Sequence, residues 1–231
     1  MIIDMNNGVE GRVRVKMCGM TRAADAVIAS EAGVDAVGVV VHAPGRSRAV
    51  DIDTARSILS VVPAFVGRVG VFVDAPIEVV VDLALKLQLT QVQLHGRETP
   101  GYVNMLAPIS VIKAVTPGEA PDWLASRPAN LAALLIDSPG GGHGMPNDWD
   151  AVEAVLRDRM DLPMIVLAGG LTPDNVGEVV ARFSPMVSLL AVDVSSGVED
   201  RAPGVKSAEK IREFMARVAS AHPSGKSGVL R

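Results

Sequence analysis

Residues able to move protons stand directly after apolar, strand-like runs in this sequence. Cys18 follows the run 13–17, and Asp137 ends an apolar run of its own. A thiol acts as a base where nearby cations lower its pKa, and Lys16 and Lys113 are candidate cations. A carboxyl group can supply the complementary acid. The two residues therefore predict proton-transfer chemistry.

Each candidate also has a structural interpretation. A lone cysteine is usually a small buried hydrophobe, and Asp137 could simply cap the loop that begins at Ser138. Asp193 is a rival carboxylate, although its small neighbours suggest that it orients the adjacent loop. An isolated histidine such as His95 is more often structural than catalytic. These alternatives stay open at the level of single residues.

Two further strand-like runs end in small residues with open backbone amides. The run 164–168 ends at Gly169-Gly170, and the run 187–192 ends at Asp193-Val194-Ser195-Ser196-Gly197. Glycine lets a ligand approach the main chain, and N–H groups near a helix start bind anions. We expect phosphate to bind Gly169, Gly170, Ser195, Ser196 and Gly197. The expected ligand is a small phosphorylated molecule.

The segments between these residues alternate between strand and helix patterns. We expect strands at 13–17, 36–41, 66–72, 91–94, 111–114, 132–136, 164–168 and 189–192. We expect helices at 22–32, 53–59, 77–87, 98–106, 149–159, 174–183 and 206–219. Three of them have a recognisable start: Thr21 precedes the first, Asp148 would cap the helix at 149–159, and Thr172-Pro173 precedes the helix at 174–183. Three prolines leave little room for a helix within 116–130.

This alternation predicts an α/β protein, a closed (β/α)₈ TIM barrel with one domain at 13–221. An open doubly wound sheet is the alternative, but it would normally carry a glycine-rich phosphate-binding loop after its first strand. Here the first strand is followed by Cys18-Gly19-Met20, which lacks that pattern. All strands of such a barrel point the same way. Their carboxyl ends would therefore gather the candidate residues on one rim. Residues 1–12 and 222–231 are expected to be an N-terminal extension and a disordered tail.

Composition fits this fold and excludes several functions. Of the 231 residues, 48% are apolar and only 3% aromatic, which suits parallel strands packed with Val, Ala, Leu and Ile. The net charge of −4 gives no reason to expect nucleic acid or a membrane as a partner. One cysteine allows no internal disulfide, and no segment reads as a leader or a membrane span. We expect a cytoplasmic protein without a metal or other cofactor.

The motifs together resemble those of one family, the phosphoribosylanthranilate isomerases. The first is Lys16-Met17-Cys18-Gly19-Met20-Thr21. Others are Gln93-Leu94-His95-Gly96, Asp137 followed by Gly141-Gly142-His143-Gly144 and Asp148-Trp149, and the run Leu167-Ala168-Gly169-Gly170-Leu171-Thr172-Pro173-Asp174-Asn175-Val176. The last is Asp193-Val194-Ser195-Ser196-Gly197-Val198-Glu199, with Pro203-Gly204 and Lys206 after it. The resemblance covers about residues 13–219 and keeps the motifs in order.

The resemblance implies a (β/α)₈ barrel and a reaction in tryptophan biosynthesis. N-(5-phosphoribosyl)anthranilate would undergo an Amadori rearrangement to 1-(2-carboxyphenylamino)-1-deoxyribulose 5-phosphate, without a metal or redox cofactor. Cys18 would be the general base and Asp137 the general acid. Arg48 would contact the anthranilate moiety, and His95 and Lys16 would also bind substrate.

Several positions depart from the family pattern. The loop 42–48 is one residue longer, which makes Arg46 a rival to Arg48. Ala49 stands in place of an aromatic residue, Met145-Pro146-Asn147 replaces a more polar segment, and Ser207 replaces an aspartate. The departures concern the anthranilate end of the site and the glycine-rich loop around His143, which could act as a lid.

Two other functions remain open from the sequence. One is the related histidine-pathway isomerase, which performs the same rearrangement on an aminoimidazole. The other is a non-catalytic phosphosugar-binding barrel. Cys18 at the first strand argues against the former, and the presence of both Cys18 and Asp137 argues against the latter. The oligomeric state is expected to be a monomer or a homodimer.

Overall fold

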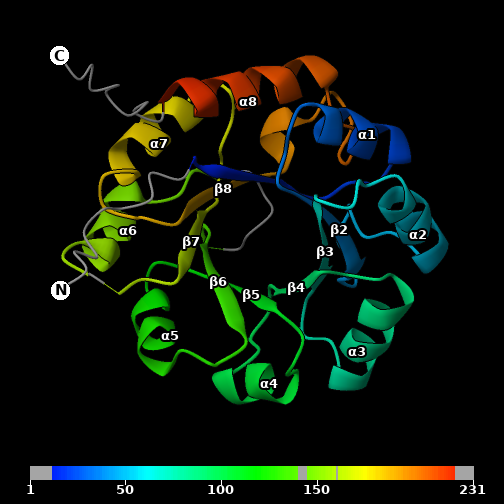
Figure 1. The fold of residues 1–231 in the computed structure, drawn as a ribbon, viewed down its shortest axis with the longest axis horizontal. Helices are drawn as coiled ribbons and strands as arrows, with labels where there is room; N and C mark the ends of the chain where they lie inside the picture. Colours follow the sequence, from blue (N-terminus) through cyan, green and yellow to red (C-terminus); the bar gives the residue numbers. More distant parts are fainter. Residues whose placement is uncertain (1–11, 140–144, 160, 222–231) are drawn as a thin grey trace, which may run out of the picture.

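The computed structural model describes residues 12–139, 145–159 and 161–221, and its strands close into a parallel barrel. The strands follow one another in sequence order around the barrel, and β8 pairs with β1, so that Val15 lies opposite Val192. The helices form a ring outside the strands (Figure 1). The predicted (β/α)₈ barrel is therefore confirmed.

The strands are β1 (Arg14–Met17), β2 (Ala36–His42), β3 (Gly67–Phe72), β4 (Gln91–Leu94), β5 (Val111–Val115), β6 (Leu131–Ile136), β7 (Met164–Leu167) and β8 (Leu190–Val194). The helices are α1 (Ala23–Glu31), α2 (Ile52–Ser60), α3 (Ile77–Lys86), α4 (Pro100–Met105), α5 (Ala120–Ser126), α6 (Trp149–Leu156), α7 (Val176–Phe183) and α8 (Ala208–Ala221). A short 3₁₀ helix, η1 (Ser196–Val198), follows β8.

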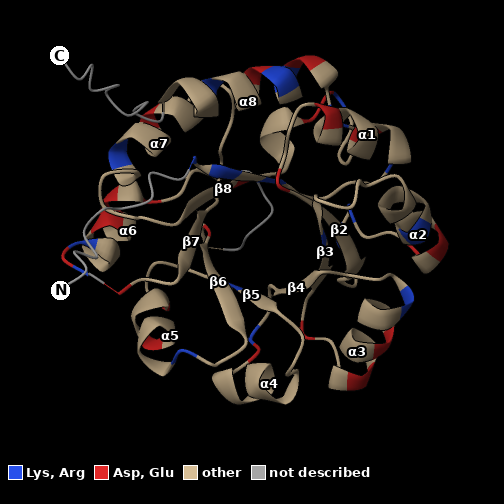
Figure 2. Cartoon of the chain, viewed as in Figure 1, with Lys and Arg blue, Asp and Glu red and all other residues tan. Residues whose placement is uncertain are grey.

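Two apolar layers hold the barrel together. Side chains alternate between the two faces of each strand, so one set packs against the helices and the other against the barrel axis. The outer layer is large and includes the buried Phe72, Phe183 and Phe214. The inner cluster is built from small and branched residues: Val69, Ile112, Ala114, Ala133, Leu135, Val166, Ala168 and Ala191. Charged residues lie mainly on the outer helices, and the strands are mostly uncharged (Figure 2).

The segment 116–130 contains a helix of seven residues, α5, although its three prolines were expected to leave little room for one. Pro121 lies in the first turn of α5, where the missing N–H would have no partner within the helix. The Glu119 carboxylate accepts hydrogen bonds from the backbone N–H and hydroxyl of Thr116 and closes the preceding turn. Arg127 ends the helix in a left-handed conformation, directly before Pro128.

Two of the predicted helix starts also differ. Thr21 does not cap α1, because its hydroxyl donates to the carbonyl of Gly204, 2.7 Å away. Helix α7 begins at Val176, two residues later than expected, because Asn175 folds back to accept a hydrogen bond from the Thr172 N–H. The predicted cap of α6 is confirmed: the Asp148 carboxylate accepts from the N–H of Ala151 at 3.0 Å.

The proposed extensions at 1–12 and 222–231 and the loop around His143 lie outside the described residues, apart from Arg12. Its guanidinium contacts the Asp35 carboxylate at 2.7 Å. Among the described helices, none is both long and apolar enough to cross a membrane.

Candidate active site

A cavity of about 290 Å³ opens at the carboxyl ends of the strands. Because all strands are parallel, the loops that follow them meet at this end of the barrel. Cys18, after β1, and Asp137, after β6, both line the cavity. The sequence-predicted residues that share its walls with them are Arg46, Arg48, His95, Gly169, Gly170, Asp193, Ser195 and Ser196.

Cys18 lies beside a buried ion pair. Lys16 is two residues earlier on β1, and its ammonium contacts the Asp193 carboxylate on β8 at 2.8 Å. Burial by itself would lower the pKa of Lys16, but the charges of Asp193 and Cys18 more than offset this, and the pKa is raised. Lys16 is only 4% exposed and does not line the cavity. In this structure the Lys16 ammonium is paired with Asp193 beside Cys18, and the substrate-binding role that the resemblance implies for Lys16 stays a prediction.

The thiol of Cys18 does not have the lowered pKa that the sequence suggested. Burial raises its pKa and the Asp193 carboxylate adds to the increase, while the nearby Lys16 ammonium acts in the opposite direction without cancelling it. Lys113, the second proposed cation, is directed elsewhere: its ammonium contacts Glu98 at 2.8 Å and lies 5.7 Å from the ring centre of Trp123. The thiol is therefore the favoured form in this structure.

Asp137 is held at the cavity wall by its neighbours. The Ser138 N–H donates to Asp137 Oδ1 at 2.8 Å, and His95 Nε2 lies 3.4 Å from Asp137 Oδ2. The other ring nitrogen of His95 is 3.1 Å from the side-chain amide of Gln93. A Gln93 amide that donates to Nδ1 leaves the proton of a neutral imidazole on Nε2, facing Asp137. His95 thus contacts the carboxylate in addition to lining the cavity.

The predicted phosphate residues meet where the loops after β7 and β8 adjoin. Gly169 and Gly170 both have positive φ, at 96° and 64°, and line the cavity together with Ser195 and Ser196. Gly197 does not line the cavity. A Cβ there would overlap the carbonyl of Leu171, so glycine lets the two loops pack closely. The loops after β7 and β8 thus contribute two glycines and two serines to the lining of the cavity.

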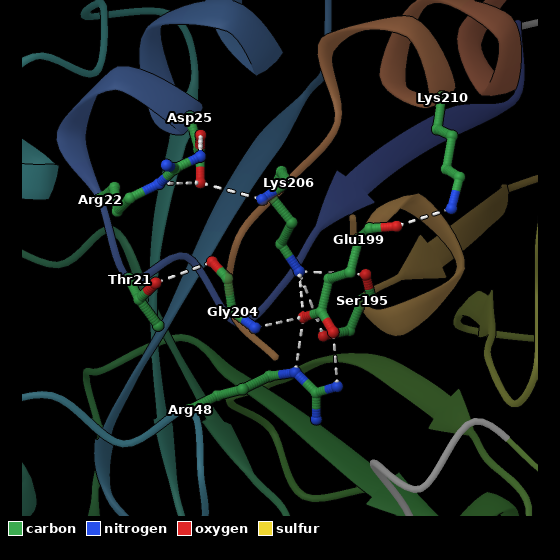
Figure 3. A network of polar contacts seen from close by, with 9 residues as sticks. All are labelled: Thr21, Arg22, Asp25, Arg48, Ser195, Glu199, Gly204, Lys206 and Lys210. Carbon is green, nitrogen blue, oxygen red and sulfur yellow. Dashed lines mark hydrogen bonds and ion pairs between the residues drawn. The ribbon is translucent and has the colours of Figure 1, made fainter. Parts of the chain in front are cut away.

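Arg48 lies at the cavity rim in a network of charged groups (Figure 3). Its Nε and one terminal nitrogen donate to the two oxygens of the Glu199 carboxylate, at 2.7 and 2.8 Å. Lys206, whose side chain is fully buried, contacts the same carboxylate at 3.0 Å and donates to the Ser195 carbonyl at 3.0 Å. Burial opposes the charge on Glu199, but the hydrogen bonds from Arg48 and Lys206 prevail and lower its pKa to about 2.

The departures from the family pattern have clear local effects. Asn147 is buried, and its amide donates to the carbonyls of Ile136 and Ala168, which ties the segment before α6 to the ends of β6 and β7. Met145 is 61% exposed. Ser207 precedes α8, and its hydroxyl accepts from the Lys210 N–H at 3.4 Å. Serine is a good helix cap, so this replacement leaves the start of α8 supported.

Three residues that shape the site had no predicted role. Gln93 and Glu199 stand inside motifs quoted above, but only the fold shows that they contact His95 and Arg48. Gly38 lies on β2, where a Cβ would come within 2.8 Å of the Cys18 sulfur. An isolated glycine within a strand often marks a close approach, and this signal was available in the sequence.

Comparison with known proteins identifies the family. A family model described as N-(5'-phosphoribosyl)anthranilate (PRA) isomerase matches residues 15–217. The chain belongs to the N-(5'-phosphoribosyl)anthranilate isomerase family. The isomerase of Halobacterium salinarum is 44% identical over 219 residues, which cover 90% of this chain and 96% of the relative. That of Pseudomonas putida strain F1 is 42% identical over 217 residues, which cover 90% and 98%.

Solved structures of the family have the same fold. The phosphoribosyl anthranilate isomerase of Thermus thermophilus superposes with a TM-score of 0.77 at 38% identity, covering 90% of this chain and 99% of that one. Another isomerase structure, in complex with reduced 1-(o-carboxyphenylamino)-1-deoxyribulose 5-phosphate, gives a TM-score of 0.74 at 36% identity, covering 90% and 99%. Membership of the isomerase family selects the first of the three functions that the sequence left open.

Proposed function

We propose that this chain converts N-(5-phosphoribosyl)anthranilate into 1-(2-carboxyphenylamino)-1-deoxyribulose 5-phosphate, with Cys18 as general base and Asp137 as general acid. The observation that carries the assignment is the placement of both groups on one cavity. The cavity is also lined by Arg48 and by the loops that contain Gly169-Gly170 and Ser195-Ser196. A phosphorylated substrate that also bears a carboxylate fits a site with an anion-binding loop and a guanidinium.

Asp137 would open the sugar ring. Its carboxyl proton passes to the furanose oxygen, the bond between C1′ and that oxygen breaks, and the nitrogen lone pair forms an iminium. This leaves Asp137 as a carboxylate. The Ser138 N–H at 2.8 Å and the Nε2 of His95 at 3.4 Å are placed to stabilise the new charge.

Cys18 would then remove the proton from C2′ and give an enolamine that tautomerises to the ketone. The base must be a thiolate, and burial opposes that form. The Lys16 ammonium lies close enough to favour the thiolate, while Asp193 keeps Lys16 charged and in place. We infer that Lys16 supports the base without touching substrate.

The two ends of the substrate would be fixed by different loops. The backbone amides at Gly169, Gly170 and Ser196, with the Ser195 or Ser196 hydroxyl, would hold the phosphate at the ends of β7 and β8. Gly197 would contribute by letting the two loops pack closely. Arg48 would pair with the anthranilate carboxylate through a charge-assisted fork. The relative that was solved with a reduced carboxyphenylamino-deoxyribulose phosphate supports a ligand of this chemistry.

We place the enzyme in the cytoplasm, where tryptophan biosynthesis would supply its substrate, and expect a monomer or homodimer that binds neither nucleic acid nor membranes. A Thermotoga maritima relative is described as dimeric. Neither a metal nor another cofactor is needed in the proposed steps.

Genetic complementation tests the proposed function. The gene is expressed in a tryptophan auxotroph that lacks this isomerase and, in parallel, in a histidine auxotroph that lacks the related isomerase. We expect growth without tryptophan and no growth without histidine. Rescue of the histidine strain alone would assign the other pathway, and rescue of neither strain by soluble protein would favour a phosphosugar-binding module.

A further inference from the structure

Glu199 joins two parts of the cavity that come from distant segments of the chain. It directly follows η1, and its side chain is 7% exposed. One carboxylate oxygen accepts from Arg48 Nε at 2.7 Å, from Lys206 Nζ at 3.0 Å and from the Gly204 N–H at 3.0 Å. The other oxygen accepts from a terminal nitrogen of Arg48 at 2.8 Å. The contact fixes both the position and the plane of the guanidinium.

Further hydrogen bonds hold Glu199 and its partner Lys206 in place. Its main-chain carbonyl accepts from Lys210 at 2.7 Å, and the Lys206 backbone N–H donates to Asp25 at 3.0 Å (Figure 3). The aliphatic part of Arg48 also packs closely against Gly19. A Cβ at this position would come within 2.7 Å of Arg48 Cδ and 2.8 Å of the Ser195 hydroxyl, so only glycine leaves room for both side chains. Gly19 has φ of 69°, so the backbone and the space both favour glycine.

We propose that Glu199 is a positioning residue for substrate recognition, which holds the Arg48 guanidinium toward the cavity so that it can receive the substrate carboxylate. Through Lys206, the same carboxylate links Arg48 to Ser195 at the phosphate end. Glu199 does not touch the substrate and takes no part in proton transfer. The inference rests on the proposed function, because Arg48 is assigned there to the anthranilate carboxylate.

The arrangement is more than a salt bridge that stabilises the fold. A long arginine side chain samples many rotamers, and a bidentate carboxylate removes most of that freedom before the ligand arrives. Preorganisation of this kind raises affinity by lowering the entropy lost on binding. Removing the charge of Glu199 should therefore weaken binding through Arg48, and it should have little effect where Arg48 is absent.

A double-mutant cycle tests this coupling. The four proteins are the wild type, Glu199→Gln, Arg48→Ala and the double variant. Dissociation constants for reduced 1-(o-carboxyphenylamino)-1-deoxyribulose 5-phosphate are measured by calorimetry, and KM and kcat are measured with N-(5-phosphoribosyl)anthranilate. We expect Glu199→Gln to raise the dissociation constant and KM about 10- to 100-fold, the scale of a lost charged hydrogen bond, with kcat changed less than about threefold.

In the Arg48→Ala background the same Glu199→Gln change should alter binding by less than about threefold, because the residue that it positions is gone. An equal loss in both backgrounds would overturn the proposal. Asp25→Asn is the matched control, because Asp25 is a buried carboxylate of the same network that contacts Arg22 and Lys206 and not Arg48. A rise in KM with Asp25→Asn as large as that with Glu199→Gln would also overturn it.

Thermal unfolding of each protein shows whether it folds. If Glu199→Gln does not fold, Glu199→Asp replaces it in the cycle, since it keeps the charge but shortens the reach to Arg48, and the same non-additivity is expected. Binding and turnover are separate readouts. Wild-type protein that binds the analogue without turning over the substrate would refute the proposed function, while the binding cycle would still decide the role of Glu199.

Discussion

Lys16 and Asp193 form an ion pair inside the barrel, with 2.8 Å between the ammonium and the carboxylate and side chains that are 5% and 11% exposed. Their strands, β1 and β8, are the pair that closes the barrel, and the two residues are register partners. The ion pair lies next to the Cys18 thiol and acts on it through both charges, in opposite directions. The pairing of β1 with β8 therefore also sets the charges that influence the protonation of Cys18, the proposed base.

Removing either charge should shift the activity of the enzyme along the pH axis. Lys16→Met removes the cation that lowers the Cys18 pKa, so less thiolate exists at a given pH and the rising limb of kcat/KM moves to higher pH. Asp193→Asn removes the anion that raises this pKa, so the limb moves to lower pH. The measurement is kcat/KM against pH for both variants. Shifts in the same direction would contradict this account.

Both substitutions leave a buried charge without its partner, which typically destabilises a protein by about 3–5 kcal/mol. The pH profiles therefore require proteins shown to be folded by circular dichroism. Lys86→Met is the matched control, because Lys86 pairs with Asp82 on the surface of α3, with a side chain that is 55% exposed. This variant should leave the profile unchanged.

Replacement of Asp137 should affect the chemical step and not the phosphate end of the site. Asp137→Asn keeps the shape of the side chain but removes the transferable proton, so kcat should fall about 10²- to 10⁴-fold. Affinity for inorganic phosphate, measured by calorimetry, should not fall, because Asp137 lies against the Gly169 loop and the substitution removes only a negative charge from beside it. Asp74→Asn is the control: Asp74 follows β3 at the same rim but does not line the cavity. Equal losses in the two variants would argue against an acid role for Asp137.

The two arginines of the loop after β2 should behave differently. Arg48→Ala should lower kcat/KM by about 2–4 kcal/mol in ΔΔG‡, the scale of a lost charged hydrogen-bond pair. Arg46 is more exposed, and Arg46→Ala should change kcat/KM little. Steady-state kinetics of both variants decides the matter. The reverse order would move the role to Arg46, and two silent variants would mean that the carboxylate is recognised elsewhere.

Close contact between the phosphate loops should make Gly197 intolerant of a side chain. Gly197→Ala places a methyl group against the Leu171 carbonyl, so the loops must separate and affinity for inorganic phosphate should fall at least about tenfold. Gly177→Ala is the control, because Gly177 lies within α7 and a Cβ there would have its nearest contact, Ala221 Cβ, 3.9 Å away. This substitution should raise the free energy of unfolding by about 0.5–1 kcal/mol and leave phosphate affinity unchanged. If Gly197→Ala binds phosphate as tightly as the wild type, the loop after β8 does not take part in phosphate binding.

The barrel was predictable because its signals are local and repeated. Each buried strand is a short apolar run, and the polar residue that follows it marks the carboxyl end, so the sequence alone places Cys18 and Asp137 on one rim. The α5 helix was missed because proline was interpreted as a helix breaker at a position where it opens a helix.

The electrostatics of the site depend on contacts between distant segments. Lys16 and Asp193 are separated by 177 positions, and Arg48 and Glu199 by 151. No local pattern shows which carboxylate pairs with which cation. Nor does sequence give the burial that raises the pKa of Cys18 against the nearby ammonium. These relationships appear only once the barrel closes.

Turnover of N-(5-phosphoribosyl)anthranilate by the wild type and by Cys18→Ala tests the central claim most directly. The wild type should consume the substrate, and the alanine variant should lose about 10²- to 10⁴-fold in kcat while it keeps the same thermal unfolding midpoint within a few degrees. Alanine fits this small buried site, so the loss would report chemistry and not folding. A Cys18→Ala variant with near wild-type kcat would contradict the account, and the base would then have to be sought at Asp193 or His95.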